Sequence, residues 1–161
     1  MAMMTLPLLL LIWIANGAPV LAHALFGTRF AYPVDGGARF LDGRPFFGTA
    51  KTVRGVAAAV ILTTLAALCL GLSPGLGALV GSAAVAGDLL TSFIKRRMGL
   101  PPSSRARGLD HVGESLLPAL LAAPRLHLEA GDIALVVGMF VALAVGLSPL
   151  LCRMRMRETP Y

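Results

Sequence analysis

Long apolar segments alternate with polar ones along most of the chain. Four of these segments come close to or exceed the roughly 20 residues that a helix needs to cross a bilayer. A fifth is shorter and contains Pro118, so we expect an irregular or partly re-entrant helix there. The pattern therefore predicts five transmembrane helices, at about residues 3–25, 54–72, 76–95, 112–124 and 131–151.

The first apolar segment carries polar and helix-bending residues near its centre, namely Asn16, Gly17 and Pro19. Gly and Pro are tolerated in membrane helices when neighbouring groups satisfy the freed backbone. We expect Asn16 either to hydrogen-bond to another helix or to line a polar cavity. Residues 1–10 contain no Lys or Arg, so the segment lacks the positive start of a signal peptide and is interpreted as a transmembrane helix.

Composition supports an integral membrane protein. Hydrophobic residues make up 57% of the chain, whereas soluble domains contain roughly 45–50%. No internal repeat or linker divides the sequence. We therefore predict a single all-α transmembrane domain that covers residues 1–161.

The positive charge is distributed unevenly. Thirteen of the 14 Lys and Arg residues lie in or beside two polar loops, at about 26–53 and 96–111, or in the C-terminal tail, and Arg125 is the exception. Because cations collect on the cytoplasmic side, this predicts both loops and the C-terminus in the cytoplasm and the N-terminus outside. A multi-pass protein of the inner, cytoplasmic membrane follows. His23 and His127 are placed near the outer face and given no role.

The net charge of +6 would suggest nucleic acid as a partner of a soluble protein. Here the cations flank apolar segments, where they meet anionic lipid headgroups. Aromatic residues are only 6% of the chain, and no stretch alternates basic and aromatic residues as a nucleic-acid surface does. The expected partners are membrane lipids and no nucleic acid, and the sequence does not predict an oligomeric state.

Residues 87–100, GDLLTSFIKRRMGL, begin inside an apolar segment and end in a block of cations. An acid at membrane depth, here Asp88, indicates function by default. Spacings of four and three residues put Asp88, Ser92 and Lys95 on one helix face. Such a face could bind a divalent metal and a polyphosphate together. Arg96 and Arg97 follow, either as phosphate contacts or as anchors at the membrane surface.

The end of the first loop has features that favour anion binding. Residues 48–52, GTAKT, come just before a helix predicted to start near Val53. Free N–H groups at a helix N-terminus attract phosphate, and Lys51 and Arg54 add positive charge. The stretch is not a Walker A loop, because it lacks the four-residue gap and the second Gly. A turn with membrane-anchoring cations is the alternative.

Residues 109–114, LDHVGE, bring two more carboxylates to the predicted membrane surface. Asp110 and Glu114, together with Asp88, could form a Mg²⁺ site, since Mg²⁺ takes one or two carboxylates plus substrate phosphates. His111 is expected to cap or hydrogen-bond locally. Because spacing identifies no nucleophile and base, the favoured chemistry is metal-assisted phosphoryl or nucleotidyl transfer.

Four motifs together resemble the CDP-archaeol synthases, which are membrane cytidylyltransferases related to the phosphatidate cytidylyltransferases. The motifs are NGAPV, DGRPFFGTAKTVRG, GDLLTSFIKRRMG and LDH, and the order and spacing agree over about residues 10–115. Residues 35–39, DGGAR, are also similar to a CDP-alcohol phosphotransferase motif. That stretch is one residue short and no downstream Asp pair follows, so that family is rejected.

The resemblance implies five transmembrane helices with the active site in the cytoplasmic loops. It implies that a lipid phosphate attacks the α-phosphate of CTP in the presence of Mg²⁺, giving a CDP-activated lipid and pyrophosphate. The acceptor lipid is not identified by the sequence. The implied catalytic residues are Asp88, Lys95 and Asp110; the substrate-binding residues are Lys51, Thr52, Arg54, Ser92, Arg96 and Arg97; and the metal ligands are Asp88, Asp110 and Glu114.

The chain departs from the family pattern at one position. The family usually reads Leu-Asp-Gln-x-Asp, whereas residues 109–113 read LDHVG, so Gly113 stands where an Asp is expected. Glu114 is one residue further, which on a helix is a rotation of about 100°. Two alternatives therefore stay open: a relative that binds nucleotide or anionic lipid without turnover, and a non-enzymatic structural or transport protein.

Overall fold

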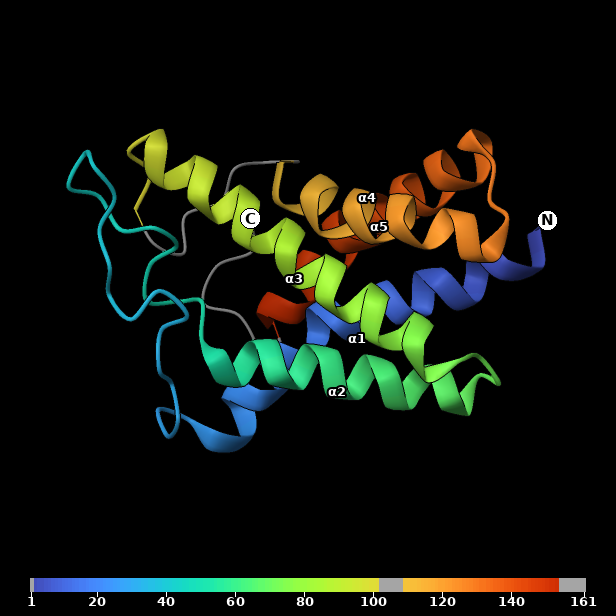
Figure 1. The fold of residues 1–161 in the computed structure, drawn as a ribbon, viewed down its shortest axis with the longest axis horizontal. Helices are drawn as coiled ribbons and strands as arrows, with labels where there is room; N and C mark the ends of the chain where they lie inside the picture. The colour runs from blue at the N-terminus through green and yellow to red at the C-terminus, as the bar shows by residue number, and fades with distance from the viewer. Residues whose placement is uncertain (1, 102–108, 154–161) are drawn as a thin grey trace.

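The computed structural model describes residues 2–101 and 109–153, and in these ranges the chain is all-helical (Figure 1). Each predicted apolar segment lies largely within one observed helix. Two isolated bridges, between Pro33 and Thr52 and between Arg39 and Pro45, are the β-type pairings of the described residues. The five helices of these ranges are α1 (Ala2–Phe26), α2 (Val53–Cys69), α3 (Pro74–Arg97), α4 (Leu109–Leu126) and α5 (Ala130–Arg153).

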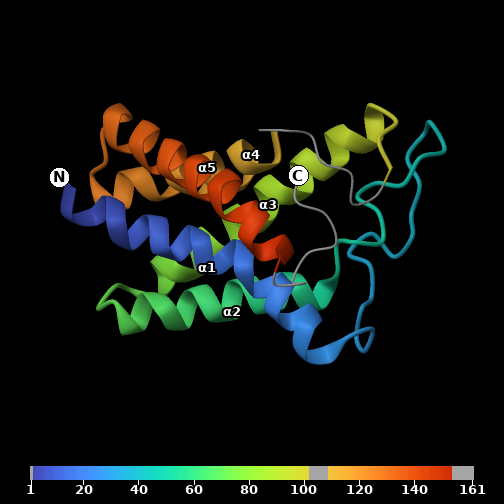
Figure 2. The same ribbon diagram turned by 180° about the vertical axis from the view of Figure 1, so that it is seen from behind.

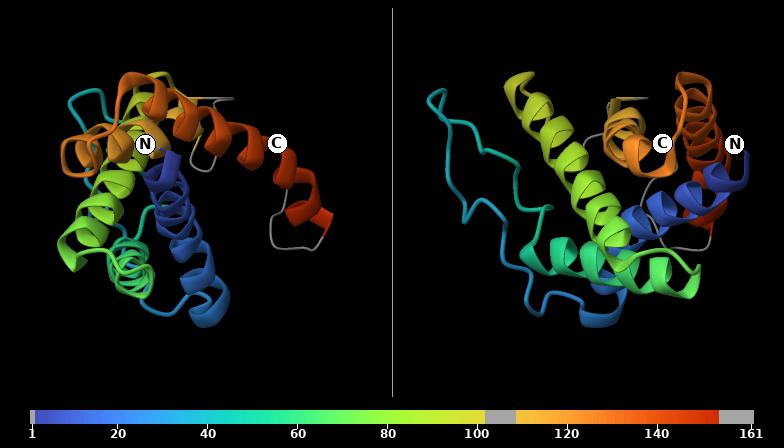
Figure 3. Two further views of the ribbon diagram at one scale, coloured as in Figure 1. Left: turned by 90° about the vertical axis from the view of Figure 1, so that its right-hand side faces the viewer. Right: turned by 45° about the vertical axis from the view of Figure 1, so that its right-hand side comes forward.

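The helices run along the length of the molecule, and the long loop of residues 27–52 lies at one end (Figures 1 and 2). Helix α3 packs between α2 and α4, and α1 contacts the other four helices. The C-terminal end of α5 leans away from the bundle (Figure 3). The beginning of α1 lies beside the α4–α5 connection, at the end opposite to the loop.

The helices meet through apolar and small side chains. Leu8, Leu11 and Ile12 of α1 are fully buried with Val80 of α3 and Val136 of α5. Between membrane helices such contacts stabilise through close packing rather than through removal of water. Large apolar side chains also cover the outside of the bundle, as on α2, where Ile61 and Leu65 are exposed.

In the part of the chain that the structure describes, two helices are long and apolar enough to cross a membrane by length and composition, Met4–Phe26 and Pro74–Arg97. Val53–Cys69 and Ala130–Gly146 are apolar but shorter. Helix α4 was expected to be irregular, yet it continues through Pro118. Pro118 is fully buried, so packing against neighbouring helices offsets the backbone hydrogen bond that proline removes.

The loop of residues 27–52 is organised by the carboxylate of Asp35. The backbone N–H groups of Gly37, Phe47 and Gly48 each donate a hydrogen bond to it, at 3.0 Å. Burial by itself raises the pKa of this carboxyl, but the three hydrogen bonds favour its charged form and bring the pKa below its ordinary value. Asp35 thus joins the two halves of the loop.

The loop is also fixed to the end of α3. The Arg97 guanidinium lies over the rings of Phe40 and Phe93, at 4.7 and 4.9 Å from their centroids, and contacts Asp42 at 2.5 Å. Arg44 donates to the carbonyl oxygen of Arg97 at 2.6 Å, near the negative end of the helix dipole. The loop therefore has a defined position relative to α3.

Candidate functional site

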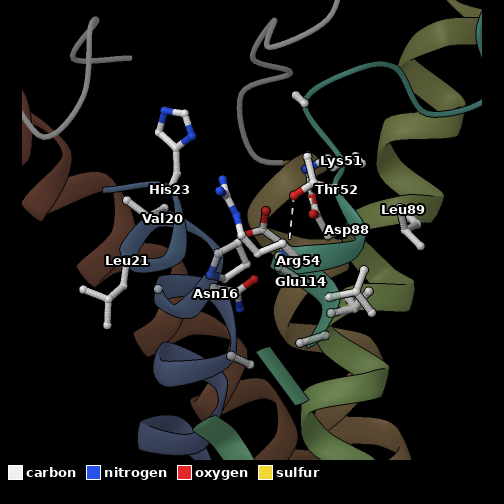
Figure 4. A pocket seen from close by; sticks show the side chains of 18 of the residues that line it. Asn16, Val20, Leu21, His23, Lys51, Thr52, Arg54, Asp88, Leu89 and Glu114 are labelled. Atoms are coloured by element: carbon white, nitrogen blue, oxygen red, sulfur yellow. Dashed lines mark hydrogen bonds and ion pairs between the residues drawn. The ribbon is translucent and has the colours of Figure 1, made fainter. Parts of the chain in front are cut away.

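A cavity of about 810 Å³ lies between the C-terminal half of α1, the end of the loop and the first turn of α2, with α3, α4 and α5 on its other sides (Figure 4). Residues that are far apart in the sequence therefore line the same cavity. Its polar and charged lining residues are Asn16, His23, Thr49, Lys51, Thr52, Arg54, Asp88, His111 and Glu114.

Lys51 and Asp88 form an ion pair in this cavity. The Lys51 ammonium is 2.6 Å from both carboxylate oxygens of Asp88, and the two side chains are 25% and 26% exposed. The backbone of Lys51 is held by a hydrogen bond from Val34 N–H to its carbonyl oxygen at 2.8 Å and by one from its own N–H to Gly48 at 3.2 Å. The loop thus brings a cation to the membrane-depth acid that the sequence identified.

The first turn of α2 begins as the sequence predicts. Thr52 is the N-cap, and its side-chain oxygen accepts a hydrogen bond from Gly55 N–H at 3.2 Å. Arg54 donates to the carbonyl oxygens of Arg29 and Gly27 while it also lines the cavity. Arg54 therefore connects the chain after α1 to the start of α2, and the positive end of this helix dipole lies at the cavity.

Glu114 supplies a second carboxylate to the same cavity from α4. It is close enough to Asp88 and Lys51 to interact with both charges. His111, one turn earlier, has its Nδ1 atom 3.8 Å from a carboxylate oxygen of Glu114. Figure 4 shows Glu114 and Asp88 facing one space, with Lys51 beside them.

A second ion pair joins α3 to α4 closer to the loop end. The Lys95 ammonium is 2.8 Å from a carboxylate oxygen of Asp110, and these side chains are only 8% and 17% exposed. Ser92 is buried on the same face of α3. The shared face of Asp88, Ser92 and Lys95 therefore exists as predicted, but its charged ends meet different partners.

The two arginines at the end of α3 also have protein partners. Arg96 is 3% exposed and donates to the carbonyl oxygen of Pro101 at 2.8 Å. Arg97 lies in the aromatic contact with the loop described above. Of the sequence-predicted site residues, the cavity lining includes Lys51, Thr52, Arg54, Asp88 and Glu114. Its described lining does not include Ser92, Lys95, Arg96, Arg97 and Asp110.

Gly113 lies in the contact between α3 and α4. A Cβ atom at Gly113 would overlap the methyl group of Thr91, and a Cβ atom at Gly87 would overlap the carbonyl oxygen of Gly113. An Asp at position 113 would therefore force the two helices apart. The expectation of an acid at this position does not fit the packing of this chain, and Glu114 is the residue of this turn whose carboxylate lies in the cavity.

The carboxylates of the cavity fit a Mg²⁺ ion that is completed by substrate. Asp88 and Glu114 are the kind and number of protein ligands that Mg²⁺ uses together with phosphate oxygens. Asp110 is instead occupied by Lys95. Among the described residues, no group of three His, Cys, Asp or Glu side chains could hold a metal alone.

Three polar lining residues were not among the predicted catalytic, substrate-binding or metal-binding residues, although lining a polar cavity was one of two expectations for Asn16. Asn16 donates to the carbonyl oxygen of Ile12 in its own helix, at 2.9 Å, and lines the cavity rather than bonding to another helix. His111 also lines it. His23 and His127 were both expected near the outer face, but His23 is in the last turn of α1, at the loop end, and His127 follows α4 at the opposite end, so the two do not share one face. Because the last turn of α1 leads directly into the loop of residues 27–52, the order of the segments alone places His23 at the loop end.

Known proteins are similar to this chain over most of its length. A family profile described as CarS-like, CDP-archaeol synthase, matches residues 73–161. The CDP-archaeol synthase of Pyrobaculum calidifontis is 44% identical over 126 residues, which cover 71% of this chain and 72% of that protein. The CDP-archaeol synthase of Pyrococcus furiosus is 31% identical over 159 residues, which cover 92% of each chain.

A solved structure has the same fold. It is described as an intramembrane enzyme for archaeal membrane lipid biosynthesis, and it is 29% identical in sequence to this chain. The match covers 89% of this chain and 91% of that one, with a TM-score of 0.72. The similarity in fold therefore extends over most of the chain.

Proposed function

The chain belongs to the CDP-archaeol synthase family, and from this premise we propose that it transfers CMP from CTP to a lipid phosphate. The products are a CDP-activated lipid and pyrophosphate. Membership makes the chain a membrane enzyme of the cytidylyltransferase type. The observation that carries the proposal is the cavity, in which Lys51, Asp88 and Glu114 come together from a loop and two helices.

The triphosphate binds at the first turn of α2 in this proposal. Lys51 and Arg54 line the cavity on that side, and the helix N-terminus adds the positive end of its dipole. Three sources of positive charge thus converge where a triphosphate would carry its negative charge. The Thr52 hydroxyl keeps the turn in place as its N-cap.

An oxygen of the lipid phosphate attacks the α-phosphorus of CTP. A new P–O bond forms, the bond to the β-phosphate oxygen breaks, and pyrophosphate leaves with the electron pair. The attacking oxygen is already ionised, so no side chain has to remove a proton. Positioning and charge neutralisation are sufficient for such a reaction, which agrees with a site built from cations and carboxylates.

Asp88 and Glu114 are the proposed Mg²⁺ ligands, together with phosphate oxygens of the substrate. When bound, Mg²⁺ neutralises phosphate charge and polarises the P–O bonds. Asp88 and Glu114 would hold this ion from α3 and α4, beside the cations that bind the triphosphate. Lys95 and Asp110, proposed from the sequence as part of the site, are now proposed to hold α3 against α4 beside it, because they form their ion pair with each other.

The lipid acceptor is proposed to lie against the apolar wall of the same cavity. Val20 and Leu21 of α1 line it and are 39% and 50% exposed. An apolar chain can contact these side chains while its phosphate reaches the charged end. Because the relatives are named for CDP-archaeol, archaeol phosphate is the first acceptor to test.

We propose five transmembrane segments in the cytoplasmic membrane, with the N-terminus outside and the C-terminus in the cytoplasm. The uneven distribution of Lys and Arg supports this orientation. The loop of residues 27–52 lies at the same end as Lys95 and the last turn of α3, as the orientation requires.

The test is synthesis of a CDP-lipid by the purified protein from labelled CTP, Mg²⁺ and archaeol phosphate. We expect product with archaeol phosphate, and at least 100-fold less from Asp88→Asn. Asp42→Asn is the matched control, because Asp42 is an acid paired with a cation outside the cavity. Failure to form a CDP-lipid with any of a panel of lipid phosphates would refute the proposal.

The alternative of a relative without turnover rested on Gly113. Since the position of Gly113 is set by helix packing and Glu114 lines the cavity, that substitution no longer favours inactivity. We therefore propose an active enzyme.

A further inference from the structure

We propose that Lys51 is an internal counter-ion that prevents Asp88 from binding metal until nucleotide arrives. Metal binding at this site would then depend on nucleotide. This inference rests on the proposed function, because it assigns Asp88 to metal and Lys51 to phosphate. It adds an order of binding, which neither the cavity nor the family resemblance supplies.

The geometry of the ion pair is the first argument. One ammonium group contacts both oxygens of the Asp88 carboxylate at 2.6 Å. A divalent cation that approaches these oxygens would meet a like charge within a few ångströms, and such repulsion is strong in a partly dehydrated site. Asp88 can therefore accept a metal only after the Lys51 ammonium has moved.

The environment of Asp88 explains why Lys51 lies against it. Asp88 lies in an apolar segment of α3, five residues after Ala83 and four after Ala84, which are both buried. An ionised carboxylate at such a place is costly unless it is paired. Lys51 supplies this pairing charge.

The side chain of Lys51 can leave without disturbing the loop. Its backbone is fixed through Val34 and Gly48, and the next residue, Thr52, forms a bridge with Pro33 and caps α2. The ammonium itself is at the end of a flexible four-carbon chain and is partly exposed to the cavity. Movement of the head group alone is therefore sufficient.

Nucleotide phosphates would move it. Lys51 lies beside Arg54 and the N-terminus of α2, where a polyphosphate is attracted. A triphosphate bound there draws the ammonium from Asp88 and at the same time provides the remaining oxygen ligands for a metal. One ligand thus removes the competing cation and completes the coordination.

The experiment measures Mn²⁺ affinity of the full-length protein in detergent, without nucleotide, by electron paramagnetic resonance of free Mn²⁺. We expect weak binding by the wild type and at least tenfold tighter binding by Lys51→Met. Lys51→Gln is the second variant and should show the same change. Arg39→Met is the matched control, because Arg39 is a cation of the same loop that is outside the described cavity lining. The Mn²⁺ affinity of this variant should equal that of the wild type.

The wild type gives an independent measurement if the Lys51 variants do not fold. Water proton relaxation detects protein-bound Mn²⁺, and we expect the signal to rise when a non-reacting CTP analogue is added. Equal Mn²⁺ affinity of the wild type with and without the analogue would overturn the inference, as would unchanged affinity in folded Lys51→Met.

The outcome is separable from that of the proposed function. CDP-lipid synthesis without any effect of Lys51 on Mn²⁺ affinity would refute the counter-ion and leave the enzyme activity intact. Tighter Mn²⁺ binding by Lys51→Met in a protein that makes no CDP-lipid would support the counter-ion and refute the activity.

Discussion

Two lysine–aspartate pairs involve the same face of α3, and they differ in their surroundings. Asp88 and Lys95 are seven residues apart, or about 10 Å along the helix. The Lys51–Asp88 pair joins a loop to the helix, is about a quarter exposed and lines the cavity. The Lys95–Asp110 pair joins two helices and is largely buried.

The difference indicates that the surroundings of an ion pair decide whether its charges can bind a ligand. Where a cavity borders the pair, either charge can exchange its partner for a ligand. Where two helices enclose the pair, exchange would leave a buried charge alone, which costs several kcal/mol. We therefore expect changes at the first pair to affect catalysis and changes at the second to affect stability.

The largest expected effect is on catalysis by Asp88→Asn. We expect a loss of roughly 10³-fold in the rate of CDP-lipid synthesis, about 4 kcal/mol of the barrier, as when a single charge-stabilising group is removed. The free energy of unfolding should fall by less than about 1 kcal/mol, since the pair is partly solvated. Initial rates and thermal unfolding of the same preparation give both values, and a large loss of stability with little loss of rate would reverse the assignment.

Asp110→Asn should show the opposite balance. Removing one partner of a buried pair costs about 3–5 kcal/mol, and we expect about 3 kcal/mol because the amide oxygen of Asn would remain beside the Lys95 ammonium. The rate of the folded fraction should fall less than tenfold. Unfolding in detergent with increasing denaturant measures the first value. A rate loss equal to that of Asp88→Asn in a fully stable variant would mean that both pairs belong to the catalytic site.

Gly113→Ala tests the helix contact that separates the two pairs. The added Cβ atom would overlap Thr91, and overpacking of this kind costs about 1–3 kcal/mol. Gly138→Ala is the matched control, because a Cβ atom at Gly138 in α5 meets nothing within 4 Å. We expect thermal unfolding to shift down for Gly113→Ala and not for Gly138→Ala. Equal unfolding temperatures would show that the helices approach less closely than described.

The sequence predicted five helical segments because each contains an apolar stretch bounded by polar or turn residues. The ends of α1 and α5 were predicted within two residues of those observed. Helix α2 was predicted to reach residue 72 but ends at Cys69, because Gly71 adopts a left-handed conformation with φ of 70° while Leu70 and Leu72 keep the segment apolar. A hydropathy pattern does not predict a helix end of this kind, because the apolar segment continues past it.

The candidate site was predicted where local sequence carries the signal. Lys51, just before a predicted helix start, and the membrane-depth acid Asp88 were both identified from their immediate context. Thr52 was named as a site residue through the family resemblance, and its role as N-cap was not predicted. Glu114 was predicted to join Asp88, and both line the cavity. The pairing of Asp110 with Lys95, outside that lining, was not predicted. It depends on how closely α3 and α4 approach, and a sequence pattern gives no measure of that distance.

Asp35 offers the smallest and most local test, because it organises the loop that carries Lys51 and has no part in the Lys95–Asp110 pair. The folded pKa of Asp35 lies below its unfolded value, which is about 3.9. Its contribution to stability is therefore complete above pH of about 4 and is lost as pH falls through the folded pKa.

Asp35→Asn should accordingly weaken the loop by about 1 kcal/mol at neutral pH, since one oxygen acceptor is lost. Amide hydrogen exchange should quicken at Phe47 and Gly48, whose N–H groups donate to Asp35, and remain unchanged at the middle of α4.

The same hydrogen exchange should quicken in the wild type below pH 4, once the intrinsic exchange rate at each pH has been allowed for. Because the loop backbone also holds Lys51, the variant should lose CDP-lipid synthesis modestly while the buried pair on α3 keeps its full stability. Faster hydrogen exchange in α4 as well would show that the loop and α4 unfold together. The Lys51–Asp88 and Lys95–Asp110 pairs would then not belong to two independent regions.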